Sequence, residues 1–223
     1  MCSSDLRELH IQLFSLHGLI RGGGLELGRD ADTGGQITYV VELARHLGAL
    51  PQVARVDLFT RLLVDRNVSP DYAEPVEKVN GKFRIVRIQC GGRRYMRKEL
   101  LWPHLDEYID KTIRFIRREK RVPDIVHGHY ADAGYVALQL ANIFGIPFVF
   151  TGHSLGRDKL LRLEQQGVPR ADMAREYRMD HRIDVEEKIL ANADLVVAST
   201  RDEAEKQYRS EEHTSELQSR QSI

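Results

Sequence analysis

Short apolar segments alternate with longer amphipathic segments along most of the chain, and this alternation is the feature that most limits the possible folds. The segments with a strand pattern are LHIQLFSL (9–16), ARVDLFTRL (54–62), DIVHGHY (124–130), IPFVFTGHS (146–154) and DLVVAST (194–200). The segments with helical periodicity between them are 35–50, 99–119 and 132–145. Strands that alternate with helices of about ten or more residues form a parallel sheet covered by helices on both faces. The sequence therefore predicts one doubly wound, Rossmann-like α/β domain.

Other parts of the pattern set details of this domain. Residues 70–90 predict a loop, a turn at Asn80-Gly81 and a strand. Pro103 predicts a bend near the start of the 99–119 helix. Gly145 follows the apolar periodicity of 132–145 and is expected to end that helix. A polar helical region is predicted from Asp158 to Ala193, and one more helix begins at 201.

Composition excludes several classes of function. The chain of 223 residues has 33 basic and 33 acidic side chains and a formal net charge of +0, which argues against general binding to nucleic acid or to a membrane surface. No apolar run approaches the roughly 18 residues that a membrane span needs, and no signal-peptide pattern opens the chain. The 2 cysteines cannot build a disulfide framework, so we expect a cytoplasmic location.

The two ends of the chain do not fit this pattern. CSSDL (2–6) can be encoded by TGC TCT TCC GAT CT, and the reverse complement of that string encodes RSEEH, which stands at 209–213. Both ends thus resemble translated sequencing-adapter DNA in opposite orientations. We interpret 1–6 and 209–223 as adapter-derived and exclude them from fold reasoning. The Rossmann-like domain is expected to occupy 7–208.

The sequence DTGGQ (32–36) lies where a loop meets the first predicted helix. Gly34 and Gly35 carry no Cβ, so backbone N–H groups there can approach a ligand closely, and a helix N-terminus favours phosphate. The alternative is that Asp32 or Thr33 caps the helix. A cap needs only one polar residue, so two glycines followed by Gln36 favour contact with a ligand.

Two further glycine and histidine patterns carry less weight. RGGGLELG (21–28) has Leu27 where a dinucleotide fingerprint needs its third glycine, and no Walker sequence is present. His127 and His129 have no cysteine or carboxylate cluster at ligand spacing, so we expect no metal site. His129, with Tyr130 and Asp132, is instead expected to line a ligand pocket.

Several residues near the predicted loops are candidates for an anion site. His153 stands at the carboxyl end of a strand, where it lines a ligand site or caps the next helix, and Lys159 follows six residues later. The segment GGRRYMRKELLWPH (91–104) brings Arg93, Arg94, Arg97 and Lys98 in front of a helix, which indicates a site for a phosphorylated ligand. Arg178 and Arg182 are also candidates, against the alternative that all these cations are solvated surface residues.

Together, long segments of the chain resemble the sucrose-phosphate synthase family of retaining, two-domain glycosyltransferases with the GT-B fold (family 4). These segments are SLHGLIRGGGLELGRDADTGGQITYVVELARHL (15–47), KELLWPHLDEY (98–108), HGHYADAG (127–134), FTGHSLGRDKL (150–160) and RIDVEEKILANADLVVASTRDE (182–203). The resemblance covers essentially all of 9–208 and assigns this chain to the N-terminal, acceptor-side domain. It implies transfer of glucose from UDP-glucose to fructose 6-phosphate with retention of configuration, giving sucrose 6-phosphate without a metal or other cofactor.

The resemblance also implies roles for single residues. Gly34, Gly35 and Gln36 would line the reaction centre, with the glycine amides towards the donor's sugar and diphosphate and Gln36 towards the acceptor. His153 would lie beside the transferred glucose. The acceptor phosphate would be bound by Lys98, Lys159, Arg182 and, through a weaker match, Arg178.

The resemblance leaves some alternatives open. The family's C-terminal domain supplies the uridine pocket and does not match this chain, so we expect the chain alone not to turn over substrate. A relative that uses free fructose would not need the three cations, and a non-catalytic sugar-phosphate sensor would bind without transfer. Oligomeric state, nucleotide preference, regulation, the host and the presence of a following phosphatase-like domain are not predicted.

Overall fold

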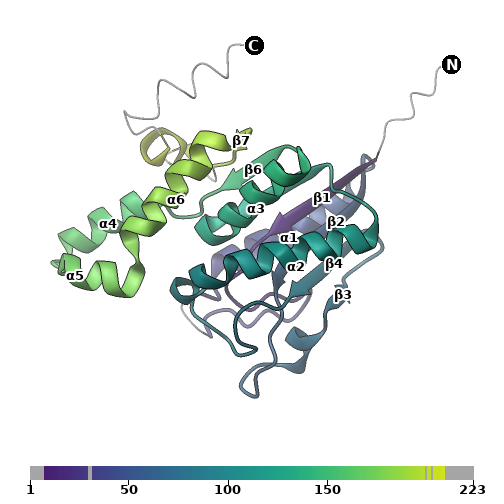
Figure 1. Cartoon of the computed structure of the whole chain (residues 1–223), viewed down its shortest axis with the longest axis horizontal. Coiled ribbons are helices and arrows are strands. Elements are labelled where there is room, and N and C mark those ends of the chain that lie inside the picture. Colours follow the sequence, from purple (N-terminus) through teal and green to yellow (C-terminus); the bar gives the residue numbers. More distant parts are fainter. Residues whose placement is uncertain (1–7, 30–31, 199, 202, 209–223) are drawn as a thin grey trace, which may run out of the picture.

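The computed structural model describes residues 8–29, 32–198, 200–201 and 203–208 (Figure 1). The two terminal segments interpreted as adapter-derived, 1–6 and 209–223, lie outside the described residues. Within the described part, none of the helices combines the length and the apolar character that crossing a membrane demands.

A seven-stranded sheet forms the centre of the domain, in the order β3-β4-β2-β1-β5-β6-β7. Its strands are β1 (Leu9–Phe14), β2 (Val53–Arg61), β3 (Val76–Lys78), β4 (Phe83–Ile88), β5 (Ile125–His129), β6 (Phe148–Thr151) and β7 (Leu195–Val196). All neighbours are parallel except β3, which runs antiparallel to β4. The order reverses between β1 and β5, since β1 pairs β2 on one side and β5 on the other. This is the doubly wound arrangement that the alternating pattern predicts.

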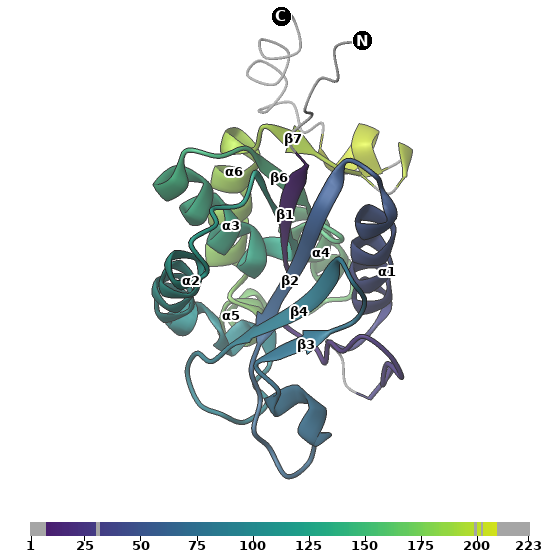
Figure 2. The ribbon, with the colours of Figure 1, turned by 90° about the vertical axis from the view of Figure 1, so that its right-hand side faces the viewer.

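Helices cover both faces of the sheet, as Figure 2 shows with α1 on one side and α2 and α3 on the other. The helices are α1 (Gly35–Ala49), α2 (Leu105–Glu119), α3 (Tyr130–Phe144), α4 (Gly156–Gln165), α5 (Arg170–Asp172) and α6 (Met179–Asn192). Ile37, Val40, Val41 and Ala44 of α1 are buried in the core on its side of the sheet, as their helical spacing predicts. A second core lies under α2 and α3, with Phe14 stacked on Phe59.

Local sequence sets where these helices begin and end. Gly145 adopts a left-handed conformation at φ 63° and ends α3, as predicted. The region of the bend expected near Pro103 is not part of the helix. Two short 3₁₀ turns, Lys98–Leu100 and Trp102–His104, lie there, and α2 begins only at Leu105. The N-cap position of α1 falls on Gly34, which has no side chain, so Asp32 and Thr33 do not occupy the capping position.

Three other sequence-based expectations need correction. The predicted loop before Asn80-Gly81 contains β3, so the turn closes an antiparallel hairpin and the sheet is not wholly parallel. A 3₁₀ turn, Pro70–Ala73, precedes that strand. The polar helical region is broken into α4, α5, a π-helical turn at Met173–Tyr177 and α6 (Figure 1). Side chains of these segments pack in a small apolar cluster of their own. The predicted last helix is a short π-helical segment, Glu203–Gln207.

Candidate functional site

A cavity of about 580 Å³ opens at the carboxyl ends of the strands, beside the point where the strand order reverses between β1 and β5. Ligands of doubly wound sheets bind in this position because the strand connections there diverge to opposite faces. The cavity is lined by eight residues that the sequence predicted for a ligand site: Gly34, Gly35, Gln36, Lys98, Tyr130, His153, Lys159 and Arg182. Its other lining residues are His17, Asp32, Ser154, Asp158 and Arg162.

The two glycines at the start of α1 are not required by protein packing. A Cβ added at Gly34 or Gly35 would meet no atom of the described residues within 4 Å apart from its own chain neighbours and helix backbone. At Gly128, by contrast, a Cβ would lie 2.7 Å from the Cα of Gly134, so the close fit of α3 on β5 needs glycine there. The space beside Gly34 and Gly35 belongs to the cavity, which is what a backbone surface for a ligand needs.

Two cavity residues have left-handed backbone conformations. Tyr130 has φ 74° at the end of β5, and His153 has φ 57° at the end of β6. Positive φ is uncommon for residues with a Cβ and typically costs about 1–3 kcal/mol, so it persists where surrounding structure imposes it. Here it turns both side chains into the cavity lining, a clustering of strain that is typical of functional sites.

Two of the predicted phosphate-binding cations are held by carboxylates. Nζ of Lys98 donates to Oδ1 of Asp32, and its backbone N–H donates to Oδ2 at 3.2 Å. Burial would raise the pKa of Asp32, but the hydrogen bond and charge of Lys98 outweigh it and hold that pKa below its usual range. The Nε of Arg182 donates to Oε1 of Glu186 at 2.8 Å, and both side chains are buried.

Lys159 differs from these two cations because, among the described residues, no carboxylate lies within 4.0 Å of its ammonium group. Its Nζ lies 4.1 Å from the ring centroid of Tyr177. Burial, then the charges of Arg182 and Lys98, lower the pKa of Lys159. An anion bound among these three cations would relieve the unfavourable burial and repulsion together.

His153 lines the cavity where β6 ends, and two buried histidines of β5 lie behind it. Burial, followed by the charge of His17, lowers the pKa of His153 to about 4. Its Nε2 lies 3.0 Å from Nδ1 of His129, which is completely buried behind it. His127 stacks on His129 with ring centroids 4.0 Å apart, and burial lowers the pKa of His127 to about 3. The described residues contain no group of three or more His, Cys, Asp or Glu side chains arranged to hold a metal.

The expectation that His129, Tyr130 and Asp132 line a pocket is met by Tyr130, which lines this cavity, and by Asp132, which lines a small pocket beside it together with Tyr130. His129 does not line the cavity, and His129 and Asp132 each contact a cavity histidine from behind. Asp132 accepts a hydrogen bond from Nδ1 of His17 at 2.9 Å, and its own exposure is 1%. The sequence reasoning missed His17, although its place directly after the first strand, in a position equivalent to that of His153, is a signal that could have found it.

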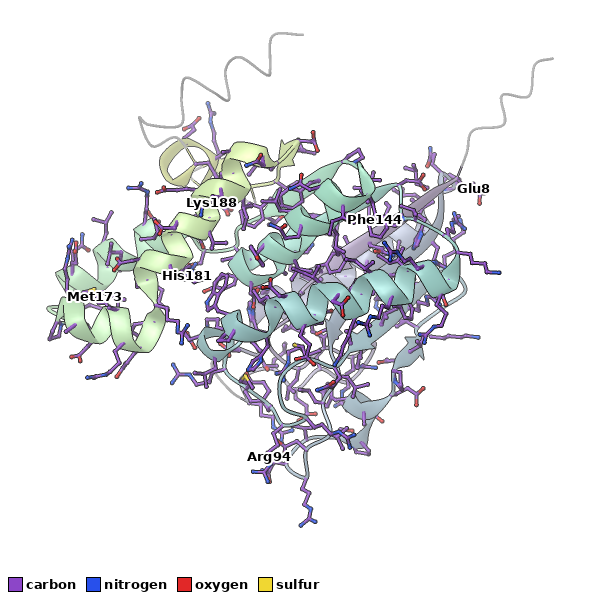
Figure 3. The ribbon with its side chains drawn as sticks, viewed as in Figure 1. Glu8, Arg94, Phe144, Met173, His181 and Lys188 are labelled. Atoms are coloured by element: carbon purple, nitrogen blue, oxygen red, sulfur yellow. The ribbon has the colours of Figure 1, made fainter. Side chains whose placement is uncertain are left out.

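Several predicted cations do not reach the cavity. Arg178 is exposed and begins α6 at φ 47°, outside the lining. Of the four cations in the 91–104 segment only Lys98 lines the cavity, since Arg93, Arg94 and Arg97 are exposed. Arg94 lies beside a separate depression bounded by 63–70 and Ala73, on the far side of the molecule from Lys188 of α6 (Figure 3). The structure therefore brings only Lys98 of these four cations to the cavity.

Comparison with known proteins gives consistent results. A sequence model of the glycosyl transferase 4-like domain family matches residues 34–210. Similar curated proteins include the probable sucrose-phosphate synthase 2 and the sucrose-phosphate synthase 4 of Arabidopsis thaliana, at 44% and 46% identity, and the sucrose-phosphate synthase of Spinacia oleracea, at 43%. Each alignment covers 91% of this chain, but this chain spans only 21–22% of those relatives' length.

A solved structure of a sucrose-phosphate synthase from Thermosynechococcus elongatus superposes with a TM-score of 0.70 and 27% sequence identity. The match covers 91% of this chain and 45% of that chain. It confirms the prediction of a Rossmann-like α/β domain of the kind that forms one half of a GT-B fold.

Proposed function

The chain belongs to the glycosyl transferase 4-like domain family, and from this we propose that it is the acceptor-side half of a sucrose-phosphate synthase. The parent reaction is transfer of glucose from UDP-glucose to fructose 6-phosphate with retention, giving sucrose 6-phosphate and UDP. The single observation that carries the proposal is the meeting of Lys98, Lys159 and Arg182 with the α1 N-terminus and His153 around one cavity.

The cationic side of the cavity is suited to the phosphate of fructose 6-phosphate. Lys98, Lys159 and Arg182 come from three separate elements, so their convergence reflects the fold and not local sequence. A phosphate would pair with Lys159, which forms no salt bridge with a carboxylate among the described residues, and share Lys98 and Arg182 with their carboxylates. These contacts would fix the sugar hydroxyl for attack, which is catalysis by positioning.

The glycine side of the cavity is suited to the donor. Departure of UDP develops negative charge on the diphosphate and positive charge at the anomeric carbon. Backbone N–H groups at Gly34 and Gly35 are preorganised donors that stabilise such negative charge, supported by the dipole of α1. Gln36 lines the same cavity, with its amide N donating to the Oγ of Ser15 at 3.3 Å. In this proposal Gln36 would face the acceptor.

The proposal divides the work between two domains. Because the chain spans about a fifth of its curated relatives and 45% of the solved one, the donor's nucleotide would be held mainly by residues outside it. We expect the chain to bind fructose 6-phosphate and to release no UDP from UDP-glucose by itself. Robust turnover by this chain alone would contradict the division.

Binding of fructose 6-phosphate and of fructose to the full chain, measured by titration calorimetry, tests the proposal. Replacing Lys159→Ala removes the cation without a carboxylate partner, and the affinity for fructose 6-phosphate should fall by about 10-fold or more, since a hydrogen bond to a charged group is worth about 1.5–3 kcal/mol. Weak binding of free fructose should change little. Lys188→Ala, an exposed cation on α6, is the matched control (Figure 3).

The outcomes separate the alternatives. Equal effects of Lys159→Ala on both sugars would favour an acceptor without phosphate. Saturable binding of fructose 6-phosphate, with no transfer even after a C-terminal donor domain is joined to the chain, would favour a sensor. Loss of affinity in Lys188→Ala equal to that in Lys159→Ala would mean that general charge, not the cavity, attracts the ligand.

A further inference from the structure

The cavity contains two imidazoles, His17 and His153, and each of them turns one ring nitrogen away from the cavity. Nδ1 of His17 lies 2.9 Å from Oδ2 of Asp132, and Nε2 of His153 lies 3.0 Å from Nδ1 of His129. The other nitrogen of each ring has no protein partner among the described residues and is not sealed from solvent. The buried partner therefore decides which nitrogen carries the proton and what the ring offers to a ligand.

The nitrogen of His17 that carries the proton follows from the chemistry of a carboxylate. An ionised carboxylate only accepts hydrogen bonds, so Nδ1 of His17 must donate to Asp132. The other oxygen of Asp132 accepts from the backbone N–H of Ala133 at 2.7 Å, which fixes the carboxylate in place. A neutral His17 held in this way has a bare Nε2, which is an acceptor open to the cavity.

The nitrogen of His153 that carries the proton follows from the surroundings of the buried His129. Nε2 of His129 is buried and has no hydrogen-bond partner in the described part of the chain, so two arrangements of the shared proton must be compared. If His153 donated, His129 would bury an N–H with no acceptor. If His129 donates through Nδ1, it buries a bare nitrogen instead, and unpaired buried donors are the rarer of the two in proteins. The second arrangement leaves the proton of His153 on Nδ1, which is a donor open to the cavity.

We propose that Asp132 and His129 are positioning residues that hold both cavity imidazoles in the Nδ1–H tautomer but turned in opposite senses, so that His17 presents its bare Nε2 as an acceptor and His153 presents its Nδ1–H as a donor. A sugar hydroxyl donates and accepts at once, whereas a fully ionised phosphate only accepts. One acceptor and one donor therefore match the hydroxyl-bearing part of a sugar, while the cations opposite match its phosphate. The assignment to sugar hydroxyls rests on the proposed function, but the tautomeric states do not.

Nuclear magnetic resonance tests the tautomers directly in the full chain labelled with ¹⁵N-histidine. Two-bond ¹H–¹⁵N correlations distinguish the two neutral tautomers, recorded at a pH at which the rings are neutral and assigned through the backbone. We expect the proton on Nδ1 in both His17 and His153. The exposed His181, which has no hydrogen-bond partner among the described residues, is the internal reference and should show the mixture of a free imidazole. Finding the proton on Nε2 of either cavity histidine, or a doubly protonated His17, overturns the proposal.

Variants test whether the buried partners cause these states. Asp132→Asn can donate an amide N–H to His17, so His17 should change to the Nε2–H tautomer while His153 does not change. His129→Leu should release His153 to the mixture of a free ring, and His129→Asn, whose amide can donate from the position of Nδ1, should restore the Nδ1–H state. Unchanged tautomers in Asp132→Asn and His129→Leu, each shown to be folded by its amide spectrum, would overturn the positioning roles. The wild-type spectrum decides the tautomers even where a variant fails to fold.

Ligand binding supplies the second readout. Asp132→Asn should lower the affinity for fructose 6-phosphate by about 10-fold, because His17 would then present a donor where an acceptor is needed. Inorganic phosphate should bind the variant and the wild type equally, since the cations are unchanged. Equal loss for both ligands would overturn the assignment to hydroxyls. Failure of the wild-type chain to bind fructose 6-phosphate, with both tautomers as expected, would contradict the proposed function and not the tautomeric states.

Discussion

Two buried polar clusters lie near opposite ends of the sheet and contain similar residue types, but they serve different roles. Near the start of the strands, Asp57 is completely buried and accepts from Nε of Arg84 at 2.7 Å, with His10 at 2.9 Å. Arg84 also donates to Glu119 at the end of α2, at 2.7 Å. At the carboxyl ends, the cavity contains His17, Lys159 and Arg182, each with polar atoms facing open space.

The difference lies in what each cluster leaves unpaired. In the first cluster both oxygens of Asp57 are used, and its pKa is lowered because the hydrogen bonds of His10 and Arg84 outweigh the effect of burial. In the second, the pKa values of Lys159 and His153 are lowered chiefly by burial, which disfavours their charged forms. Nδ1 of His10 is buried without a hydrogen-bond partner among the described residues, but the carboxylate at the centre of the first cluster is fully paired. A fully paired buried carboxylate stabilises the fold, whereas a cluster that keeps desolvated groups beside a cavity is arranged for a ligand.

The largest effect on stability should come from disrupting the cluster around Asp57. Asp57→Ala leaves Arg84 and Arg55 without their shared buried carboxylate, and the free energy of unfolding should fall by about 3–5 kcal/mol. Urea denaturation measures this change. Asp110→Ala, which breaks only an exposed pair with Arg114, is the control and should have little effect. A change in Asp57→Ala no larger than in the control would show that the first cluster does not support the fold.

Arg182 takes part in both stability and the site, so it can separate the two. Arg182→Gln leaves Glu186 buried without a cation and should lower stability, and the affinity for fructose 6-phosphate should fall by about 10-fold or more. Adding Glu186→Gln removes that buried charge and keeps an acceptor for the N–H of Gly156, so the free energy of unfolding should recover while affinity does not. Calorimetry and urea denaturation of single and double variants measure both. Recovery of affinity in the double variant would contradict a phosphate contact by Arg182.

Arg178 shows how far sequence could go towards this site. Arg178 and Arg182 are four residues apart, so helical periodicity places them on one face. The chain enters α6 from a π-helical turn, and Arg178 takes a left-handed conformation before the helix begins, which removes it from that face. The alternating pattern predicted the sheet, the end of a strand predicted His153, and the start of the first helix predicted Gly34 and Gly35. The sequence could not predict which carboxylates pair with the cations. Lys98 and Asp32, for example, lie in different loops and meet only in the folded chain.

Acid pH should weaken the fold through the histidines around the cavity. An unfolded histidine has a pKa near 6.5, whereas burial lowers the pKa of His153 to about 4 and of His127 to about 3. As the pH falls below about 6.5 the unfolded state binds these protons first, so stability is greatest above that pH and decreases towards pH 4. Each such ring contributes a slope of about 1.4 kcal/mol per pH unit. Urea denaturation at several pH values measures the slope, with the exposed His181→Gln as the control.

A flat profile between pH 6.5 and 4 would mean that the rings near the cavity are not desolvated. Asp32 and Asp57 do not account for a slope in this range. Their pKa values are lowered from an ordinary carboxyl value near 4, so their contribution to stability is lost only at more acidic pH.

The smallest effect on stability is expected at Gly34, and it sharpens the comparison most. Gly34→Ala adds a methyl group that would meet no atom of the described residues within 4 Å apart from its chain neighbours. Gly34 has φ −129°, which alanine adopts readily. The free energy of unfolding should therefore change by no more than about 0.5 kcal/mol. Affinity for fructose 6-phosphate should nonetheless fall by about threefold or more, because the methyl group occupies the cavity. Gly128→Ala is the matched contrast: its Cβ would clash with α3, so stability should fall by about 1–3 kcal/mol. If Gly34→Ala changed neither quantity, the glycines at the start of α1 would serve neither the fold nor this ligand, and their proposed contact would have to be with the donor alone.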